Sequence, residues 1–531
     1  MAPSSHSVPQ ALSRSSDLTR NESLPFKMTT GPMRVDQTPD SSSEEAAVMD
    51  EKSKLSQIEN GVSNAHTINI DPIKEKALVR KIDWHVIPLV MLLYLNSFID
   101  RVNIGNARLY GLEEDLGMQG NQYQIAVSIL FVTYVLGELP SNLIMKKYVR
   151  PSRWIACITM GWGVVATFSG FTQSYAGLIV CRLLLGLTEA GLFPGMVVYL
   201  TFWYTKRELA LRTAYLFVSA AIAGSVGGLL AYGIGFMDGL AGYSGWRWIL
   251  IIEGIPTIIL AVVCWFYLAD EGHTAYFLNQ EERDLVLARR AAQTGVTETF
   301  SWEDSRKALT DWKTYLFAVT QFCAACMLYS YSTFLPTIIL QIMPEAGRAT
   351  TQLLTMPCYA VGAIVYLCLA WLSDKKQTRG PIAASCAAVS VIGYGILLSN
   401  GPPGVLYFGC CVVAAGIYIA LGLNIAWLNT NNPRYGSRTT ASGTQIMLGN
   451  TAGIVAPFLY PTEDRPRFVK GHATNLGLVA LGVLIFTFFH LYFSWENKQR
   501  RLGRRDHKME GKTEEEILAM GADNPRFVYT T

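Results

Sequence analysis

The sequence is dominated by apolar segments that are long enough to cross a lipid bilayer. A membrane-spanning helix needs about 20 mostly apolar residues. Half of the 531 residues are hydrophobic and only 16% are charged, which is too apolar for a soluble chain of this length. The sequence therefore predicts an all-α membrane protein with twelve spans. They cover residues 86–107, 122–145, 154–173, 175–201, 212–236 and 246–268, and then 314–341, 351–373, 382–399, 404–429, 438–460 and 473–495.

A polar segment divides the twelve spans into two sets of six. We assign residues 269–312 to this central loop, which is expected in the cytosol from the distribution of Lys and Arg among the loops. The N-terminal bundle is expected at 81–268 and the C-terminal bundle at 313–495. Residues 1–80 are rich in Ser, Asn, Asp, Glu and Lys, which is typical of a disordered tail, and residues 496–531 form a second tail.

Two landmarks recur at nearly the same offset in both halves. Asp83-Trp84 precedes the first span, and Asp311-Trp312 precedes the seventh span 228 positions later. Lys146-Lys147 follows the second span, and Lys375-Lys376 follows the eighth span 229 positions later. The recurrence indicates an internal repeat and predicts two pseudo-symmetric six-helix bundles. Repeated halves around a site at the membrane midplane are typical of transporters.

The short loops predict the orientation in the membrane. Loops after even-numbered spans carry clusters of Lys and Arg, whereas the first loop holds three acidic residues at 113–115. Because Lys and Arg are enriched in cytoplasmic loops, both termini and the central loop are expected in the cytosol. The loop at 461–472 departs from this rule, since it carries basic residues on the predicted outer side.

The fourth span contains two charged residues, Arg182 and Glu189. Insertion of each into the membrane centre costs roughly 2.5–3.5 kcal/mol. They lie seven residues apart, so both project from one helix face, and Gly186 and Gly191 leave room beside that face. The pair could lock helices together, but charges inside a membrane favour a functional role.

Further charges lie in three other spans of the N-terminal half. Asp100 and Arg101 lie about 14 residues past Val86, roughly 20 Å from the cytosolic end, or form a helix-end pair facing water. Glu138 and Glu253 lie in the second and sixth spans. For these two glutamates an interhelical lock is favoured, and a role in proton coupling stays open.

The predicted cores of the last six spans contain no Asp, Glu, Lys or Arg. They offer neutral hydrogen-bonding groups instead: Tyr329, Ser330, Tyr331, Thr333, Asn424, Asn429, Gln445 and Asn450. We therefore expect the N-terminal half to supply charge, and the C-terminal half to supply shape and hydrogen bonds. The candidate substrate-binding residues are Arg101, Arg182, Tyr329, Tyr331 and Asn424, and the candidate proton-coupling residues are Asp100, Glu189, Glu138 and Glu253.

These residue types can couple the movement of protons to that of anions. A buried arginine stays protonated and can bind a carboxylate through two hydrogen bonds. A carboxyl group in a dry site can take up and release a proton near neutral pH. Arg101 with Asp100, or Arg182 with Glu189, could then act as a switch. Protonation of the carboxyl would free the arginine for an anionic substrate.

Other kinds of function lack support in the sequence. All ten cysteines lie in apolar segments, and the one CxxC, at 323–326, has no second metal-ligand pair, so we expect packing roles and no metal site. There is no HExxH, GxSxG or phosphate-binding loop, which argues against an enzyme, and we expect no cofactor. A net charge of +3 does not suggest nucleic acid. We expect a monomer in the lipid bilayer.

Two basic loops recur at corresponding places in the two halves, KKYVRPSR at 146–153 and SDKKQTRGP at 373–381. Their charges can pair with helix ends and stabilise one conformation, although the same residues also set the topology. The candidate gating residues are Lys146, Lys147, Arg150, Asp374, Lys375 and Arg379.

Together these features resemble the major facilitator superfamily, whose cytosolic loop motif is similar to SDKKQTRG. FIDRVNIGNA at 98–107, RLLLGLTEAGLFPG at 182–195 and DNPRFVY at 523–529 resemble the anion:cation symporter family, in its fungal branch of allantoate, nicotinate and vitamin permeases. The resemblance implies the twelve-helix fold and import of small organic anions with protons across the plasma membrane. By motif position it implies that Asp100, Arg101, Arg182 and Glu189 are the coupling and substrate residues.

Two other functions stay open. A proton-antiport exporter of drugs or secondary metabolites usually carries a Gly-Pro pair in the fifth span, where this chain has GSVGG at 224–228. A nutrient sensor would bind a ligand without moving it. A transport assay separates a sensor from a transporter.

Overall fold

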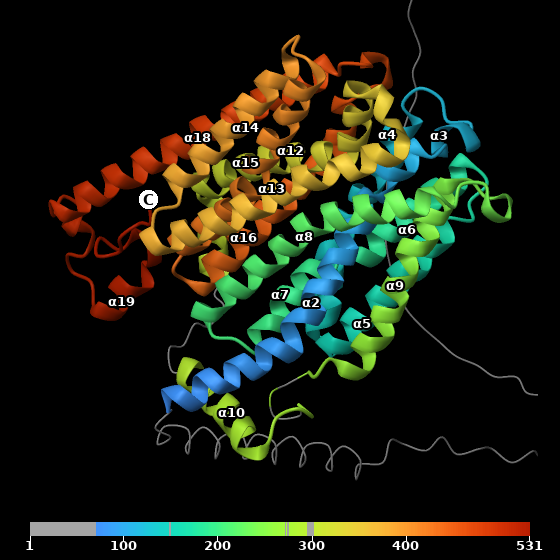
Figure 1. Cartoon of the computed structure of the whole chain (residues 1–531). Coiled ribbons are helices and arrows are strands. Elements are labelled where there is room, and N and C mark those ends of the chain that lie inside the picture. Colours follow the sequence, from blue (N-terminus) through green and yellow to red (C-terminus); the bar gives the residue numbers. More distant parts are fainter. Residues whose placement is uncertain (1–70, 148–149, 271, 273–274, 295–301) are drawn as a thin grey trace, which may run out of the picture. The chain divides into compact units, whose positions relative to one another are not determined.

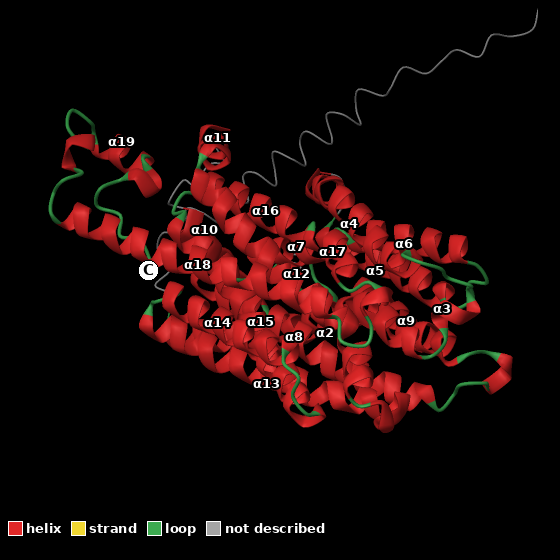
Figure 2. Cartoon of the chain, turned by 90° about the horizontal axis from the view of Figure 1, so that it is seen from above, coloured by secondary structure: helices red, strands yellow, loops and turns green. Residues whose placement is uncertain are grey.

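The computed structural model describes residues 71–147, 150–270, 272, 275–294 and 302–531. These residues belong to one compact unit, Gly61–Thr531. The segment at 1–70, most of the expected disordered tail, lies outside the described residues. Every element in the described part is an α-helix or a short 3₁₀ helix, as Figures 1 and 2 show, so the expected all-α fold is confirmed.

Six long helical segments form each half of this unit. The N-half contains α2 (Pro72–Leu109), α4 (Gln122–Lys147), α5 (Pro151–Ser169), α6 (Tyr175–Glu189) continued by α7 (Leu192–Thr201), α8 (Lys206–Gly235) and α9 (Gly245–Tyr267). The C-half contains α12 (Trp312–Ile342), α13 (Gly347–Lys376), α14 (Gly380–Leu398), α15 (Pro403–Asn431), α16 (Tyr435–Asn450) continued by α17 (Ala452–Val455) and η3 (Ala456–Leu459), and α18 (Val469–Arg501).

Shorter helices lie between and after these spans. They are α3 (Leu112–Asp115), η1 (Leu240–Gly242), α10 (Gln280–Thr294), α11 (Trp302–Thr310), η2 (Pro344–Ala346), η4 (Thr462–Asp464), η5 (Asp506–Lys508), α19 (Glu514–Ala519) and η6 (Gly521–Asp523). In Figure 1, α3 and α19 lie at opposite ends of the long helices. We call these the α3 end and the α19 end.

Helix packing repeats between the two halves. Helix α5 packs on α9 as α14 packs on α18, and α4 packs on α6 as α13 packs on α15. Likewise α2 packs on α8 as α12 packs on α16. Between the halves, α8 packs on α13, α2 packs on α12, and α4 contacts α17. The two bundles are therefore pseudo-symmetric, as the repeated landmarks predict.

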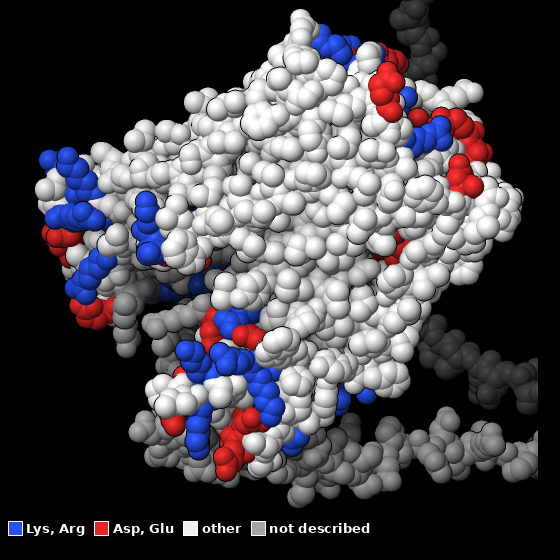
Figure 3. All heavy atoms as spheres, viewed as in Figure 1, with Lys and Arg blue, Asp and Glu red and all other residues white. Residues whose placement is uncertain are grey.

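The surface is that of a membrane protein. Nine helices in the described part of the chain are long and apolar enough to cross a membrane. On the face in Figure 3, the charged side chains gather at the two ends, and a band with few charges separates them. That band matches the part of a bundle that contacts lipid.

Helix α2 begins before the membrane-spanning segment. Residues 72–80, which we assigned to the tail from sequence, are its first turns, and the Asp71 side chain accepts a hydrogen bond from the Ile73 amide. The extension is held by the central loop: Arg289 of α10 forms ion pairs with Glu75 of α2, at 2.9 Å, and Glu208 of α8, at 2.7 Å. Helix α10 therefore connects two helices of the N-half at the α19 end.

Glycines allow the closest helix crossings. A Cβ atom at Gly186 of α6 would overlap the Leu130 carbonyl oxygen of α4, and one at Gly105 of α2 would overlap the Thr333 carbonyl oxygen of α12. Gly186 lies one turn before Glu189, so the close approach of α4 and α6 also positions that carboxylate.

We predict that Gly186→Ala lowers the free energy of unfolding by about 1–3 kcal/mol, because the added methyl group meets backbone and not a flexible side chain. Thermal unfolding in detergent, followed with a dye that reacts with the buried cysteines as they become exposed, measures the effect. Gly233→Ala in α8 is the matched control, since nothing lies within 4 Å of a Cβ there. Equal melting temperatures for the two variants would contradict the prediction.

Candidate functional site

The centre of the candidate site is an ion pair between Arg101 of α2 and Glu189 of α6. The Arg101 Nε donates to Glu189 Oε1 at 2.7 Å, and the Ser97 hydroxyl, one turn earlier on α2, donates to the same oxygen. Both charged side chains are buried. Within the described residues, Arg101 Nη2 and Glu189 Oε2 have no hydrogen-bond partner. The pair therefore retains one free donor and one free acceptor.

Aromatic rings surround the Arg101 guanidinium. Its Cζ lies 4.6 Å from the centroid of the Tyr134 ring of α4. Tyr94 of α2 and Tyr329 of α12 also lie near enough to interact electrostatically with its charge. A cation beside aromatic faces is stabilised by the ring quadrupoles. The same rings give a flat apolar lining on which a planar ligand could stack.

The ion pair is connected to the C-half through Tyr329. Its hydroxyl donates to Asn450 Oδ1 of α16 at 3.1 Å, and the Asn450 amide donates to Glu138 Oε2 of α4 at 3.5 Å. The Phe131 ring of α4 lies 4.6 Å from the Tyr329 ring. Tyr329, Asn450 and Glu138 are only half-buried. Polar side chains of the two halves therefore contact one another here, and these side chains are partly exposed.

The spans that supply Glu189 and Asn450 are both interrupted at the site. Glu189 is the last residue of α6, and α7 begins at Leu192. Asn450 is the last residue of α16, and α17 begins at Ala452. Pro194 supplies no backbone N–H to continue the helix. The two interruptions lie in the fourth span of the N-half and in the fifth span of the C-half. Interrupted helices mark the binding sites of many transporters.

Asp100 lies in a second polar group, inside the N-half. Its Oδ2 accepts hydrogen bonds from the Trp162 indole of α5, at 2.8 Å, and from the Thr257 hydroxyl of α9, at 3.3 Å. Glu253 of α9 is also buried, and no hydrogen bond to either of its oxygens is found among the described side chains. The Asp100 carboxylate is therefore bound by two other helices of the same half.

The pairing of charges differs from our expectation. The sequence suggested Arg101 with Asp100 or Arg182 with Glu189, whereas the structure pairs Arg101 with Glu189. Neighbours on a helix project about 100° apart, so Asp100 and Arg101 face different helices. Arg182 is buried, and its Nη2 donates to Asn103 Oδ1 at 3.4 Å. It lacks the carboxylate partner that sequence reasoning gave it.

Two candidates of the C-half lie away from Arg101. The Tyr331 hydroxyl donates to the Cys410 carbonyl of α15 at 3.0 Å. The Asn424 amide donates to the Phe317 carbonyl at 3.1 Å and to Gln321 at 2.7 Å. Both side chains are therefore engaged inside the C-half, whereas Tyr329, two residues before Tyr331, faces the N-half.

The candidate gating residues lie at the α19 end. Asp374 and Arg379 are 3.6 Å apart, and the Lys375 ammonium lies 4.8 Å from the Trp371 ring centroid. In the corresponding loop, Arg150 is exposed before the first turn of α5, and the side chains of Lys146 and Lys147 lie outside the described residues.

At the α3 end, ion pairs and hydrogen bonds connect the two halves. Arg108 of α2 lies 2.8 Å from Glu113 and donates to Thr462 of the C-half at 3.1 Å. Arg465 of the C-half lies 3.7 Å from Glu113. Burial lowers the pKa of Arg465, and the charge of Arg108 lowers it further. On the face in Figure 3, by contrast, the surface is hollowed between α10 and the end of α18.

Sequence reasoning missed several partners of the charged residues. Ser97 precedes Arg101 by four residues, and Tyr134 precedes Glu138 by four residues, so each pair shares a helix face. That spacing is a signal that could have identified them. Trp162 and Thr257, the partners of Asp100, come from other helices, and no spacing in the sequence indicates their contact.

Comparison with known proteins identifies the family. The model of the Major Facilitator Superfamily matches residues 90–457. The uncharacterized transporter C11D3.18C of Schizosaccharomyces pombe is 40% identical over 436 residues, which cover 82% of this chain and 87% of that relative. The high-affinity nicotinic acid transporter of Saccharomyces cerevisiae is 32% identical over 430 residues, which cover 80% of this chain and 79% of that relative.

A solved structure shares the fold. It is a bacterial homolog of the human lysosomal transporter Spinster in an inward-facing and occupied conformation. The TM-score is 0.58 at 15% identity, and the match covers 76% of this chain and 96% of that one. The chain is a multi-pass membrane transporter of a small molecule, and not an enzyme, and it belongs to the Major Facilitator Superfamily.

Proposed function

We propose that this transporter imports a small organic anion together with protons across the plasma membrane, and that it works as a monomer. The observation that carries the proposal is the buried pair of Arg101 and Glu189 beside Tyr329 of the other half. The similarity to a nicotinic acid transporter supports a carboxylate as substrate. The proposal places the chain in the anion:cation symporter family, in its fungal branch of allantoate, nicotinate and vitamin permeases.

Protonation of Glu189 is the coupling step in this proposal. A protonated Glu189 no longer attracts the Arg101 guanidinium, which then binds the carboxylate of the substrate. Arg101 Nη2 has no partner among the described groups and can donate first. Two parallel N–H···O bonds then fix the orientation of the anion. When the anion leaves, Glu189 loses its proton and pairs with Arg101 again.

The aromatic lining favours a planar acid. Tyr94, Tyr134 and Tyr329 lie around the guanidinium, so a flat ring could stack beside the bound carboxylate. Asn450 offers an amide for a ring nitrogen or carbonyl oxygen of the substrate. Glu138 binds this amide and would respond to its movement. Substrate binding would therefore change the hydrogen bonds between the C-half and Glu138 of the N-half.

The other candidates take supporting roles. Asp100 and Glu253 form a second acidic group that could hold a proton, and Arg182 offers a second cation near it. Tyr331 and Asn424 form hydrogen bonds inside the C-half, and in this proposal they support its packing and leave substrate contact to Tyr329.

We infer that the α19 end is cytosolic and that the described conformation faces the cytosol. The basic loops lie at that end, as the positive-inside rule requires. Arg108, Glu113 and Arg465 join the halves at the opposite end. In the alternate conformation the α19 end would close, and the charges of the two basic loops would stabilise the closed state. Those charges belong to Lys146, Lys147, Arg150, Asp374, Lys375 and Arg379.

The decisive experiment is uptake of labelled organic acids by cells that express the protein, with nicotinate, allantoate, pantothenate and biotin among them. We expect accumulation of at least one acid, and loss of accumulation when a protonophore removes the proton gradient. Accumulation that a protonophore does not change would exclude proton coupling. Efflux without accumulation would indicate an exporter, and binding without movement would indicate a sensor.

We predict that Arg101→Lys reduces uptake about ten- to hundredfold. Lysine retains the charge but loses the planar fork that binds a carboxylate, and a hydrogen bond to a charged group contributes about 1.5–3 kcal/mol. Initial uptake rates at equal surface expression measure the effect. Arg80→Lys, an exposed position on the same helix, is the matched control and should have no effect. Unchanged uptake by the Arg101 variant would remove Arg101 from the substrate site.

We predict that Glu189→Gln abolishes proton-driven accumulation but preserves exchange of labelled for unlabelled substrate. Glutamine keeps the shape and hydrogen bonds of a protonated glutamate and cannot release a proton. Uptake against pH and counterflow in vesicles separate the two activities. Glu114→Gln, an exposed residue of α3, serves as control. If the Glu189 variant accumulated substrate with the pH dependence of the unaltered protein, Glu189 would not be the proton carrier.

A further inference from the structure

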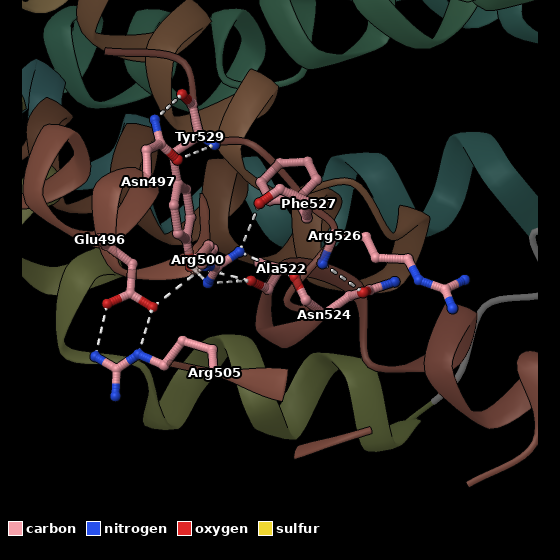
Figure 4. A network of polar contacts seen from close by, with 9 residues as sticks. All are labelled: Glu496, Asn497, Arg500, Arg505, Ala522, Asn524, Arg526, Phe527 and Tyr529. Carbon is pink, nitrogen blue, oxygen red and sulfur yellow. Dashed lines mark hydrogen bonds and ion pairs between the residues drawn. The ribbon is translucent and has the colours of Figure 1, made fainter. Parts of the chain in front are cut away.

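The segment after α18 turns back and docks on the C-half. Helix α18 ends at Arg501, and the chain then passes through η5, α19 and η6. In Figure 1 this segment lies beside the end of α18. Residues 521–531, which we call the tail strap, make the contacts drawn in Figure 4. A tail without a binding surface would not be expected to bury its residues, yet Tyr529 is only 4% exposed.

Two asparagines each bind both backbone groups of one strap residue. The Asn497 amide of α18 donates to the Tyr529 carbonyl at 2.8 Å, and its oxygen accepts from the Tyr529 N–H at 2.9 Å. Asn431, the last residue of α15, binds Thr530 in the same way, at 3.1 and 2.8 Å. This arrangement satisfies an extended backbone as a neighbouring strand would. It orders two consecutive residues without regard to their side chains.

Arg500 of α18 binds the carbonyl groups of the strap. Its Nη1 donates to the carbonyls of Asn524, at 3.0 Å, and Phe527, at 2.7 Å, and its Nη2 donates to that of Ala522, at 3.0 Å. Glu496, one turn earlier, accepts from Arg500 Nε at 3.2 Å and fixes the guanidinium (Figure 4). Hydrogen bonds from a charged donor are stronger than neutral ones.

Tyr529 is the side chain by which the C-half recognises the strap. Its ring stacks on Phe493 with centroids 4.7 Å apart, and the ring centroid lies 4.4 Å from the Arg500 guanidinium carbon and 5.4 Å from the Lys313 ammonium. Its hydroxyl donates to the Ala522 carbonyl at 3.0 Å. Neighbouring Val528 is 60% exposed. Recognition therefore combines backbone capture with one buried aromatic anchor.

The docked strap contacts four helices of the C-half at the α19 end. Lys313 belongs to the first turn of α12, and Asn431 ends α15. The Arg379 N–H, at the start of α14, donates to the Thr531 carbonyl at 2.7 Å. The Trp427 indole of α15 donates to the Thr530 carbonyl at 2.7 Å. With Asn497 and Arg500 of α18, these contacts connect helix ends that are far apart in the sequence.

We propose that the α19 end of the C-half is a peptide-binding surface whose ligand is the tail strap, and that docking holds α12, α14, α15 and α18 together as one body. Alternating access moves one half against the other, so each half must keep its helix spacing while it moves. The strap holds the helix spacing of the C-half at the α19 end, where the described helices stop and polar loops begin. Release of the strap loosens this end of the C-half and leaves the N-half unchanged.

Hydrogen exchange of the full chain, measured by mass spectrometry, tests the proposal without knowledge of the substrate. In the unaltered protein the amides of Tyr529 and Thr530 should exchange slowly, because Asn497 and Asn431 bind them. Tyr529→Ala should accelerate exchange on the order of tenfold or more in the strap and in the adjoining ends of α12, α15 and α18. Val528→Ala, with its exposed side chain, is the matched control and should change neither.

Three results would overturn the proposal. The first is rapid exchange of the strap in the unaltered protein, since the segment would then not be docked. The second is fast exchange of the strap in Tyr529→Ala together with unchanged exchange at the helix ends, since docking would then not hold the helices together. The third concerns Asn431→Leu, which keeps about the size of the side chain but removes both the donor to the Thr530 carbonyl and the acceptor for the Thr530 N–H, and serves if Tyr529→Ala fails to fold. Slow strap exchange in that variant would contradict the proposed backbone recognition.

Discussion

The buried ion pair of Arg101 and Glu189 is the constraint on which the rest of the site depends. An arginine cannot lose its charge in a membrane, so the cost of burying it is reduced by a close anion, by hydrogen bonds and by neighbouring aromatic rings. Glu189 supplies the anion at 2.7 Å, and the Tyr134 ring lies against the guanidinium. Gly186 then becomes necessary, because only a glycine lets α6 approach α4 one turn before Glu189. The helix crossing and the ion pair thus support each other.

The C-half contributes no charge to this centre, and the reason is electrostatic. A second carboxylate near Glu189 would repel it, and a second cation would compete for it. Tyr329 and Asn450 instead offer neutral groups that can exchange partners at little cost. Such groups suit the half that must approach the ion pair in one conformation and leave it in the other. The division into a charged and a neutral half, evident in the sequence, therefore fits a site between moving bodies.

The sequence predicts the helices better than it predicts their contacts. Hydropathy alone placed the twelve spans, because the thickness of the bilayer sets the length of each one. The partner of Arg101 depends on how α2 is rotated against α6, and hydropathy contains no such information. That is why Asp100, its neighbour in sequence, was paired with it wrongly. Tyr331 shows the same limit: an inward-facing polar residue in a span can serve either packing or a ligand, and only the contacts distinguish these roles.

Both halves use an arginine outside the spanning segments, or at their margin, to join helix ends at the α19 end. In the N-half, Arg289 of α10 bridges Glu75 and Glu208 and so connects α2 with α8. In the C-half, Arg500 binds the strap, which connects α18 with α15 through Asn431. The two devices differ in sequence and in chemistry, since one joins carboxylates and the other joins backbone carbonyls. In the N-half this contact adds to the direct packing of α2 on α8 and to the ion pair of Arg212 with Asp83. Each half therefore uses an arginine to connect helix ends at the α19 end, although the polar segments involved, α10 and the tail strap, share no repeated motif.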